Sequence, residues 1–419
     1  MFTIVKTFVA LTLAFVCGVS LRAQEINYDE SKVPSYVLPD PLVSESGKMI
    51  RNSCQWEMKR RPELLKLFER EMFGKMPGKP ADLHFEILNE DKSAFGGLAT
   101  RKEIKVSFNA SGTSCMVLLM YVPNDRKGSV PAFLGVNFRG NHATSTDEGI
   151  SFPTEEKVAS YGPKYKFHKR GEFAYRWPYE FVLSNGYAVV TFYSGDVDPD
   201  YDDGFKNGVH GTFENPESRQ PDSWGTIAAW SWGLSRALDY LEIDKDVDAS
   251  RVAVIGHSRL GKAALWAGAT DIRFALVISN NSGCSGAALS RRCFGEHVHY
   301  INRKFPHWFC ENYKKYGMNE DKLPFDQHEL LALIAPRPLY VASASLDEWA
   351  DPKGEMLSLT HAVPVYKLYG YEGITSYELP EVNSPVRSDI MGYHLREGKH
   401  RIELYDWQQY VIFADKFLK

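Results

Sequence analysis

The chain of 419 residues lacks the cysteine and histidine spacings that usually bind zinc. Its six cysteines include no C-x-x-C pair, and its twelve histidines include no H-E-x-x-H motif. Both spacings bring metal ligands to one turn or one helix face, so their absence argues against a zinc site. We therefore expect neither a structural nor a catalytic metal.

The sequence also has no basic block, and its charges nearly balance, with 49 Lys and Arg against 53 Asp and Glu. Nucleic acid and anionic membranes are therefore not expected as partners. After the N-terminus no apolar run is long enough to span a membrane. We expect a monomer.

The N-terminal residues 1–23 combine an early lysine with a short apolar run and small residues that end at Ala23. This is the pattern of a secretory signal peptide cleaved near Ala23, which predicts a secreted or periplasmic protein. A lipoprotein anchored through Cys17 is the alternative, but the bulky Val16 before it argues against that interpretation.

The mature chain would keep five cysteines, an odd number, so at least one thiol must stay unpaired. An exported chain permits disulfides. Cys284 and Cys293 flank one loop and could pair, and two buried free thiols are the alternative.

No linker, repeat or low-complexity segment divides residues 24–419, so one domain is expected. Residues 55–73 have an amphipathic helical pattern, and residues 82–123 resemble antiparallel strands. Short apolar runs then alternate with longer segments, one of which, 227–241, has the single apolar face of a crossover helix. This alternation predicts a mostly parallel sheet. The runs are Phe133–Phe138, Tyr187–Phe192, Val252–Ile255, Phe274–Ile278, Leu339–Ala342 and Val365–Leu368.

The most informative stretch is RVAVIGHSRLGKAALWAG, residues 251–268. It predicts a buried strand, a sharp turn at Ser258 and then a helix, which is the arrangement of a nucleophile elbow. Such a turn exposes the serine Oγ and aims helix N–H groups at a developing oxyanion. The usual G-x-S-x-G spacing is altered, because Leu260 takes the last glycine position and Gly261 follows it. A serine that caps an ordinary helix is the alternative.

The longer string GHSRLGKA resembles the G-x-S-R-x-G-K-[GA] signature of the bacterial glucuronoyl esterases, carbohydrate esterase family fifteen. The resemblance implies an α/β-hydrolase fold with a mostly parallel central sheet, crossover helices and an N-terminal antiparallel extension. It also implies a serine esterase, without a cofactor, that cleaves 4-O-methyl-glucuronoyl esters between glucuronoxylan and lignin alcohols. Further similar blocks follow in family order: VNFRGNH (136–142), RWPYEF (176–181), SWGTIAAWSWGLSRALDYL (223–241), SNNSGCSGAALSRR (279–292), APRPLYVASASLDEWADPKGE (335–355) and HLREGKHRIELYDW (394–407).

A serine hydroxyl needs a base, and the base needs an orienting carboxylate. In α/β-hydrolases the base comes last in the chain. His400 lies in a glycine-containing loop before the closing helix, where both the fold and the family motif place the base, and it is the expected base. His394 and His361 are weaker candidates.

The orienting acid is less obvious. Many glucuronoyl esterases carry a glutamate in a pattern like S-N-E-S-G, where this chain has Asn281. Some bacterial members have a second acid in D-x-W-A-D-P, which corresponds here to Asp347. We therefore predict Asp347 as the acid. Asp351 is the alternative, although Pro352 after it is typical of a helix start. A site inactivated by Asn281 is the other possibility.

Four further residues are expected to contact the substrate. The backbone N–H of Arg259 should form part of the oxyanion hole, and the resemblance implies that its guanidinium faces the oxyanion too. Lys262 shares a helix face with Ser258. The resemblance implies that Lys262, Glu296 and Trp349 hold the hydroxyls and ring of the glucuronate. Taken alone, they could be a solvated lysine, a solvated glutamate and a packed tryptophan.

Two other functions remain open on the sequence. An acetyl-xylan or other carbohydrate esterase could use the same fold, because a fold does not determine a substrate. The amide at Asn281 also permits a non-catalytic carbohydrate-binding relative.

Overall fold

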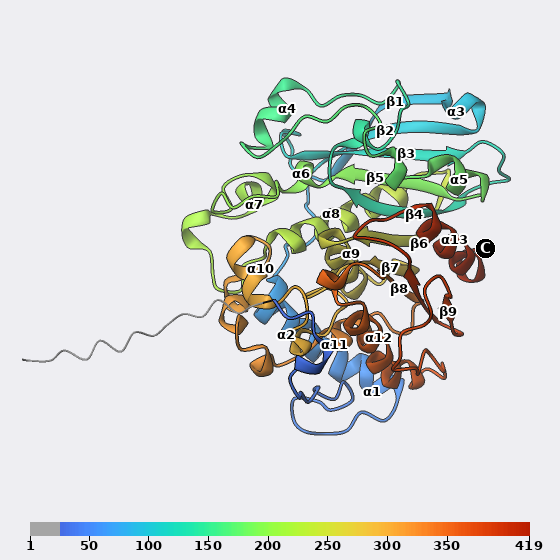
Figure 1. The fold of residues 1–419 in the computed structure, drawn as a ribbon. Coiled ribbons are helices and arrows are strands. Elements are labelled where there is room, and N and C mark those ends of the chain that lie inside the picture. Colours follow the sequence, from blue (N-terminus) through green and yellow to red (C-terminus); the bar gives the residue numbers. More distant parts are fainter. Residues whose placement is uncertain (1–25) are drawn as a thin grey trace, which may run out of the picture.

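The computed structural model describes residues 26–419, and the expected signal peptide lies outside the described residues. A ten-stranded mixed sheet runs through the molecule, and helices pack on both of its faces (Figure 1). Its strands are β1 His84–Ser93, β2 Ala99–Ser107, β3 Cys115–Pro123, β4 Val130–Asn137, β5 Ala188–Tyr193, β6 Val247–His257, β7 Leu276–Asn280, β8 Leu339–Ala344, β9 Val386–Arg387 and β10 Met391–Arg396.

The strand order is β1-β2-β3-β5-β4-β6-β7-β8-β10-β9. The neighbours from β5 to β10 in this order are all parallel, while β1, β2 and β3 form an antiparallel extension at one edge and β9 pairs antiparallel at the other. Parallel neighbours need crossover connections, which here are helices. The predicted α/β-hydrolase sheet with its N-terminal antiparallel extension is confirmed.

The helices lie in two layers, with α8, α9, α11 and α12 on one face of the sheet and α5 and α13 on the other (Figure 1). Residues 53–73 form one nearly continuous helical segment, with π-helical turns around α2, as the amphipathic pattern predicts. The helices are α1 Ser53–Gln55, α2 Arg61–Phe68, α3 Ala94–Gly97, α4 Glu155–Ser160, α5 Tyr179–Ser184, α6 Ser194–Val197, α7 Gly208–Phe213, α8 Thr226–Leu241, α9 Arg259–Thr270, α10 Val298–Lys304, α11 Gln327–Ala332, α12 Pro352–Lys367 and α13 Leu404–Leu418.

Strand β6 shows why the apolar run before Ser258 forms a central strand. Val252 and Val254 pack into the core on the α8–α9 face, while Ala253 and Ile255 pack into the core beneath α13. A strand whose side chains alternate between two covered faces has no polar face, so it appears in the sequence as a continuous apolar run. Burial on both faces fixes the register of β6, and with it the position of its carboxyl end.

One predicted strand is wrong. Val365–Leu368 lies at the end of α12 and just beyond it, not in a strand. A short apolar run cannot by itself distinguish a buried helix turn from a strand, and the preceding residues continue the helix without a break. The strand that pairs with β8 in the sheet is instead β10. Its buried His394 and Arg396 interrupt the run of apolar residues that would indicate a strand.

The five described cysteines are all free, so the possible pairing of Cys284 with Cys293 is wrong. The Cys284 thiol lies in the core beside Ser285 Oγ, while Cys293 Sγ points to the carbonyl of Ser290. Burial raises the pKa of the Cys284 thiol, which keeps it protonated and unreactive. Within residues 26–419, none of the helices has the length and apolar character needed to cross a bilayer.

Candidate active site

Ser258 occupies the turn between β6 and α9, as the sequence predicts. Its backbone has φ 58° and ψ −131°, a strained conformation for a residue with a side chain. The turn is tight enough that a Cβ at residue 256 would come within 2.0 Å of the carbonyl oxygen of Leu260, so only glycine fits there. The backbone N–H of Ser258 donates to the carbonyl of Asn280 on β7 at 2.9 Å, which holds the turn against the sheet.

Three of the predicted residues meet through hydrogen bonds at the carboxyl ends of the strands. Ser258 Oγ lies 2.8 Å from His400 Nε2, and His400 Nδ1 lies 2.5 Å from Asp347 Oδ2. The carboxylate can only accept, so His400 Nδ1 carries the proton and Nε2 is free to accept the serine proton. Asp347 is buried, while 39% of the His400 side chain is exposed, facing the solvent side of the site.

Asn281, which stands where the motif resemblance leads us to expect a glutamate, also contacts this group. It follows β7 with a positive φ of 47°, and its Nδ2 donates to Asp347 Oδ2 at 2.7 Å. The same carboxylate oxygen therefore accepts from both the amide and the imidazole. The Oδ1 of Asn281 has no hydrogen-bond partner within the described chain. Asn281 thus holds the orientation of Asp347 and does not take its place.

The weaker candidates lie elsewhere. Asp351 caps the start of α12 and forms a buried ion pair with Arg292 at 2.8 Å. His394 is fully buried and binds Asp406 at 2.8 Å. His361 lies within α12 and packs against other aromatic rings. No hydrogen bond joins any of these candidates to the Ser258 hydroxyl among the contacts described.

The side chain of Arg259, the first residue of α9, is held by Asp200, with which its Nη1 forms an ion pair. Asp200 also accepts from Trp308 Nε1 at 2.8 Å and from His307 Nε2 at 3.1 Å. Burial opposes ionisation of Asp200, but Arg259 and the other two donors outweigh it and hold its pKa below the usual range. The guanidinium therefore stays paired with a fixed negative charge beside Ser258.

Lys262 lies one turn into α9 and is almost fully buried. Its Nζ donates to the carbonyls of Ser282 and Cys284 at 2.7 and 2.6 Å, and it pairs with Glu296 Oε2 at 3.1 Å. An ammonium has three protons, so the protein already occupies all three. Lys262 is therefore buried and holds Glu296 in place, and it is not the solvated lysine that the sequence alone would also allow.

Trp349 lies in the 3₁₀ turn Glu348–Ala350 after β8, with its ring edge-to-face against Tyr300 at 4.8 Å between centroids. It lines a cavity of about 230 Å³ with most of the predicted site residues. Two larger cavities, of about 640 and 580 Å³, contain none of those residues. The cavity beside Ser258 is lined by Ser258, Arg259, Lys262, Asn281, Ser282, Gly283, Glu296, Tyr300, Phe305, Trp308, Trp349, Ala350 and His400.

The sequence alone did not indicate Asp200, Tyr300 or Trp308 as site residues. Tyr300 and Trp308 line this cavity, and Asp200 binds Arg259 and Trp308. Asp200 lies in a run of acidic residues, and nothing local distinguishes it from its neighbours. Trp308 lies in an aromatic cluster that is equally typical of a core. Across residues 26–419, no group of His, Cys, Asp and Glu side chains is placed to hold a metal ion.

Comparison with known proteins identifies relatives among the carbohydrate and glucuronoyl esterases. The family model for glucuronyl esterase of fungi matches residues 174–370. Carbohydrate esterase MZ0003, from an unknown prokaryotic organism, is 48% identical over 397 residues, which cover 93% of this chain and 91% of that protein. The solved structure of the glucuronoyl esterase from Solibacter usitatus is 44% identical with a TM-score of 0.88, covering 93% of this chain and all of the other.

A more distant relative, the 4-O-methyl-glucuronoyl methylesterase of Phanerochaete carnosa, is 28% identical over 342 residues, covering 80% of this chain and 72% of that protein. The sheet and its elbow define the chain as an α/β hydrolase. Its relatives place it more narrowly: the chain belongs to the glucuronoyl esterase family, carbohydrate esterase family fifteen. The expected enzyme class, a carboxylic ester hydrolase, is confirmed.

Proposed function

We propose that the chain is a serine esterase that hydrolyses 4-O-methyl-glucuronoyl esters through a triad of Ser258, His400 and Asp347. The observation that carries the proposal is the continuous chain of hydrogen bonds from Ser258 Oγ through the His400 ring to Asp347 at a nucleophile elbow. Because Asn281 supports the acid with a further hydrogen bond, its presence is compatible with an active site.

The geometry supports a two-step reaction. His400 Nε2 takes the hydroxyl proton as Ser258 Oγ attacks the ester carbonyl carbon. The tetrahedral intermediate collapses, the bond to the alcohol oxygen breaks, and His400 gives its proton to the departing alcohol. Water then attacks the acyl-enzyme while His400 takes one of its protons. The glucuronate leaves as its acid, and Ser258 recovers its proton from His400.

Charge on the carbonyl oxygen would be stabilised at the start of α9. The backbone N–H of Arg259 follows the nucleophile directly, and the helix dipole favours negative charge there. The Arg259 guanidinium is held beside Ser258 by Asp200 and needs no reorganisation as charge develops. A pre-oriented cation of this kind stabilises the transition state more than the neutral ester.

The proposed acyl group is a glucuronoyl unit, as in the substrates named for the relatives. Its carboxyl is esterified and carries no charge, so the sugar hydroxyls are the hydrogen-bond donors available for recognition. Glu296, held in place by Lys262, can accept hydrogen bonds from them, and Trp349 can shield the ring. A cavity of about 230 Å³ is smaller than the ~300–1,000 Å³ of pockets for drug-sized ligands and suits one sugar unit.

The biological substrate that we propose is the ester between glucuronoxylan and a lignin alcohol, cleaved by a secreted or periplasmic monomer without a cofactor. The test is a hydrolysis panel of benzyl glucuronate, benzyl galacturonate and an aryl acetate, with wild type and Ser258→Ala. We expect the glucuronate ester to have the highest kcat/KM, because epimerisation at C4 moves one hydroxyl away from its acceptor.

Two results would contradict the proposal. A wild-type preference for the aryl acetate would favour an acetyl-carbohydrate esterase instead. Failure of a fluorophosphonate to label Ser258 in well-folded protein would favour a non-catalytic carbohydrate-binding relative.

A further inference from the structure

Arg396, at the end of β10, binds the backbone of the loop that carries His400. Its Nη1 donates to the carbonyl of Glu397 at 2.6 Å. Its Nη2 donates to the carbonyls of Lys399 and Arg401, at 2.9 and 2.8 Å. The residues that supply these last two carbonyls directly precede and follow His400 in the chain. One guanidinium nitrogen therefore holds the peptide on both sides of this histidine.

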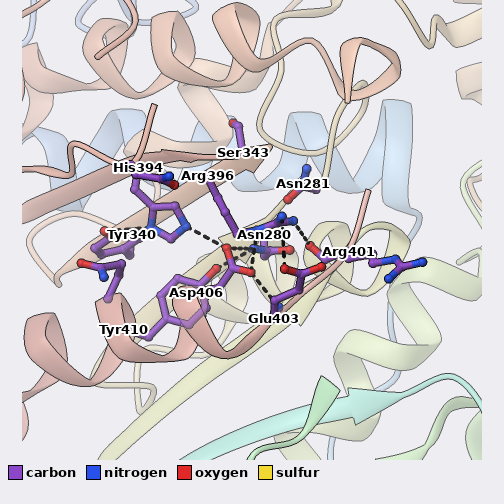
Figure 2. A network of polar contacts seen from close by, with 12 residues as sticks. Asn280, Asn281, Tyr340, Ser343, His394, Arg396, Arg401, Glu403, Asp406 and Tyr410 are labelled. Carbon is purple, nitrogen blue, oxygen red and sulfur yellow. Dashed lines mark hydrogen bonds and ion pairs between the residues drawn. The ribbon is translucent and has the colours of Figure 1, made fainter. Parts of the chain in front are cut away.

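Arg396 is itself anchored by Asp406, in the first turn of α13 (Figure 2). Arg396 Nε donates to Asp406 Oδ2 at 3.0 Å, and the same oxygen accepts the N–H of Glu403 at 2.7 Å to cap the helix. The other oxygen, Oδ1, lies 2.8 Å from His394 Nε2. Both members of the Arg396–Asp406 pair are buried, so the charges are held in one geometry with little screening.

Asn280 connects this network to the nucleophile. Its Nδ2 donates to Asp406 Oδ1 at 3.2 Å and to Tyr410 Oη at 2.7 Å (Figure 2). Its Oδ1 lies 2.6 Å from His257 Nδ1, and its backbone carbonyl accepts the N–H of Ser258. One buried amide therefore contacts both the elbow and the carboxylate that anchors Arg396.

The loop that carries Asp347 is bound to the loop that carries His400. The N–H of Leu346, next to Asp347, donates to the carbonyl of Gly398 at 2.8 Å. Gly398 has φ +109°, a conformation that glycine adopts without strain. The loops that carry the acid and the base are thus joined through their backbones, and Arg396 fixes one side of that junction.

We propose that Arg396, held by Asp406, is a positioning residue that sets the distance and angle between His400 and Ser258. The inference rests on the proposed function, since it concerns the base of that triad. His400 is the most exposed member of the triad. Besides its two triad hydrogen bonds and a contact of its ring with that of His257 at 4.6 Å between centroids, its position depends on the loop backbone. Loops are mobile unless their backbone is bound, and an error of about 1 Å in a reacting group can cost about 100-fold in rate.

The test compares Arg396→Met and Arg396→Lys with a matched control, Arg337→Lys. Arg337 also donates to three backbone carbonyls, those of Gly268, Asp271 and Phe274, but it precedes β8 at the opposite end of the strand from Asp347. All variants are assayed for kcat and KM on benzyl glucuronate and for their melting temperature, with Ser258→Ala as a reference.

We expect Arg396→Met to lower kcat about 100-fold with KM within about twofold, because the base is displaced and the sugar cavity is not. Arg396→Lys should lower kcat about tenfold, since an ammonium keeps the charge but cannot bind Asp406 and the three carbonyls together. Arg337→Lys should lower the melting temperature and leave kcat unchanged. If Arg396→Met does not fold, the comparison of the two lysine variants decides the question.

The proposal is overturned if Arg396→Lys keeps wild-type kcat, or if Arg337→Lys loses as much kcat as Arg396→Lys at the same loss of stability. These outcomes can be distinguished from failure of the proposed function. If the proposed function is wrong, Ser258→Ala itself would still hydrolyse the ester.

Discussion

At the scale of single residues, the unusual feature is that an amide stands beside the acid of the proposed triad. Asn281 and His400 donate to the same oxygen of Asp347, so the carboxylate carries the charge and the amide only orients it. The motif resemblance could predict Asp347 as the acid. It could not predict the contact between Asn281 and Asp347, because residues on different strands meet only in the folded sheet.

This arrangement predicts different costs for the two residues. Asp347→Asn should lower kcat about 10⁴-fold, because an amide can favour the wrong histidine tautomer and cannot stabilise the imidazolium. Asn281→Ala removes one hydrogen bond to a charged group, which contributes about 1.5–3 kcal/mol, so a loss of roughly tenfold to a hundredfold is expected. Steady-state kinetics on benzyl glucuronate measure both variants. A larger loss for Asn281→Ala than for Asp347→Asn would contradict the assignment of the acid.

The substrate residues give a second prediction at this scale. Lys262→Met and Glu296→Ala should each lower kcat/KM for benzyl glucuronate about tenfold to a hundredfold, while hydrolysis of an aryl acetate stays near the wild-type rate. The acetyl group is too small to reach Glu296, so kcat/KM should fall for the sugar ester alone.

The matched control for this substrate prediction is Lys102→Met. Lys102 is another almost fully buried lysine, paired with Asp244 at 2.7 Å away from the cavity. Its removal should lower stability without changing the ratio of kcat/KM for benzyl glucuronate to kcat/KM for the aryl acetate. Equal losses on both substrates for Lys262→Met would mean that this lysine supports the whole site, not sugar recognition.

At the scale of elements, the elbow and the crossover pattern could be predicted from the sequence because each depends on local signals. The strand–turn–helix of residues 247–270 needs a buried apolar run, a tight glycine turn and a helix, and all three appear in order. Strand β10 could not be found in this way, because the buried polar network that holds the His400 loop requires His394 and Arg396 within it. An apolar pattern finds buried strands whose side chains are all apolar, and β10, although fully buried, also contains His394 and Arg396.

The tight turn predicts the effect of adding one methyl group. Gly256→Ala would force its Cβ to within 2.0 Å of the Leu260 carbonyl oxygen, so α9 must move. We expect a loss of stability of roughly 1–3 kcal/mol and a large loss of kcat, since Ser258 moves with the helix. Gly78→Ala is the control, because its added Cβ has no atom within 4 Å. Denaturant unfolding and kinetics measure both. Wild-type stability and kcat for Gly256→Ala would contradict this account of the turn.

At the scale of the whole molecule, the mostly parallel sheet could be predicted from the alternation of apolar runs along the sequence. The buried ionisable groups beneath the active site could not be predicted, since burial of a carboxyl depends on the complete fold. Glu355 is the clearest case. It lies fully buried in α12 and accepts from the N–H of Gly283 and the hydroxyl of Ser343. Burial raises its pKa to about 8, with a further contribution from nearby Asp347.

This carboxyl makes the stability of the protein depend on pH. Its pKa is higher in the folded chain than in the unfolded chain, so the folded state binds more protons between about pH 4.5 and pH 8. Stability should therefore fall as the pH rises through that range, and the isosteric Glu355→Gln should remove this contribution. We expect the gain in melting temperature of Glu355→Gln over wild type to be greater at pH 9 than at pH 6. An equal difference at the two pH values would mean that Glu355 is already ionised at pH 6.

The central claim is that Ser258 forms a covalent ester with the glucuronoyl group, and the most direct measurement is mass spectrometry of protein quenched during turnover of benzyl glucuronate. The account predicts a glucuronoyl mass on the proteolytic fragment that contains Ser258 in wild type, and none in Ser258→Ala, whose turnover should be lower by about 10⁴-fold or more. Turnover of the ester by well-folded Ser258→Ala at the wild-type rate would contradict it.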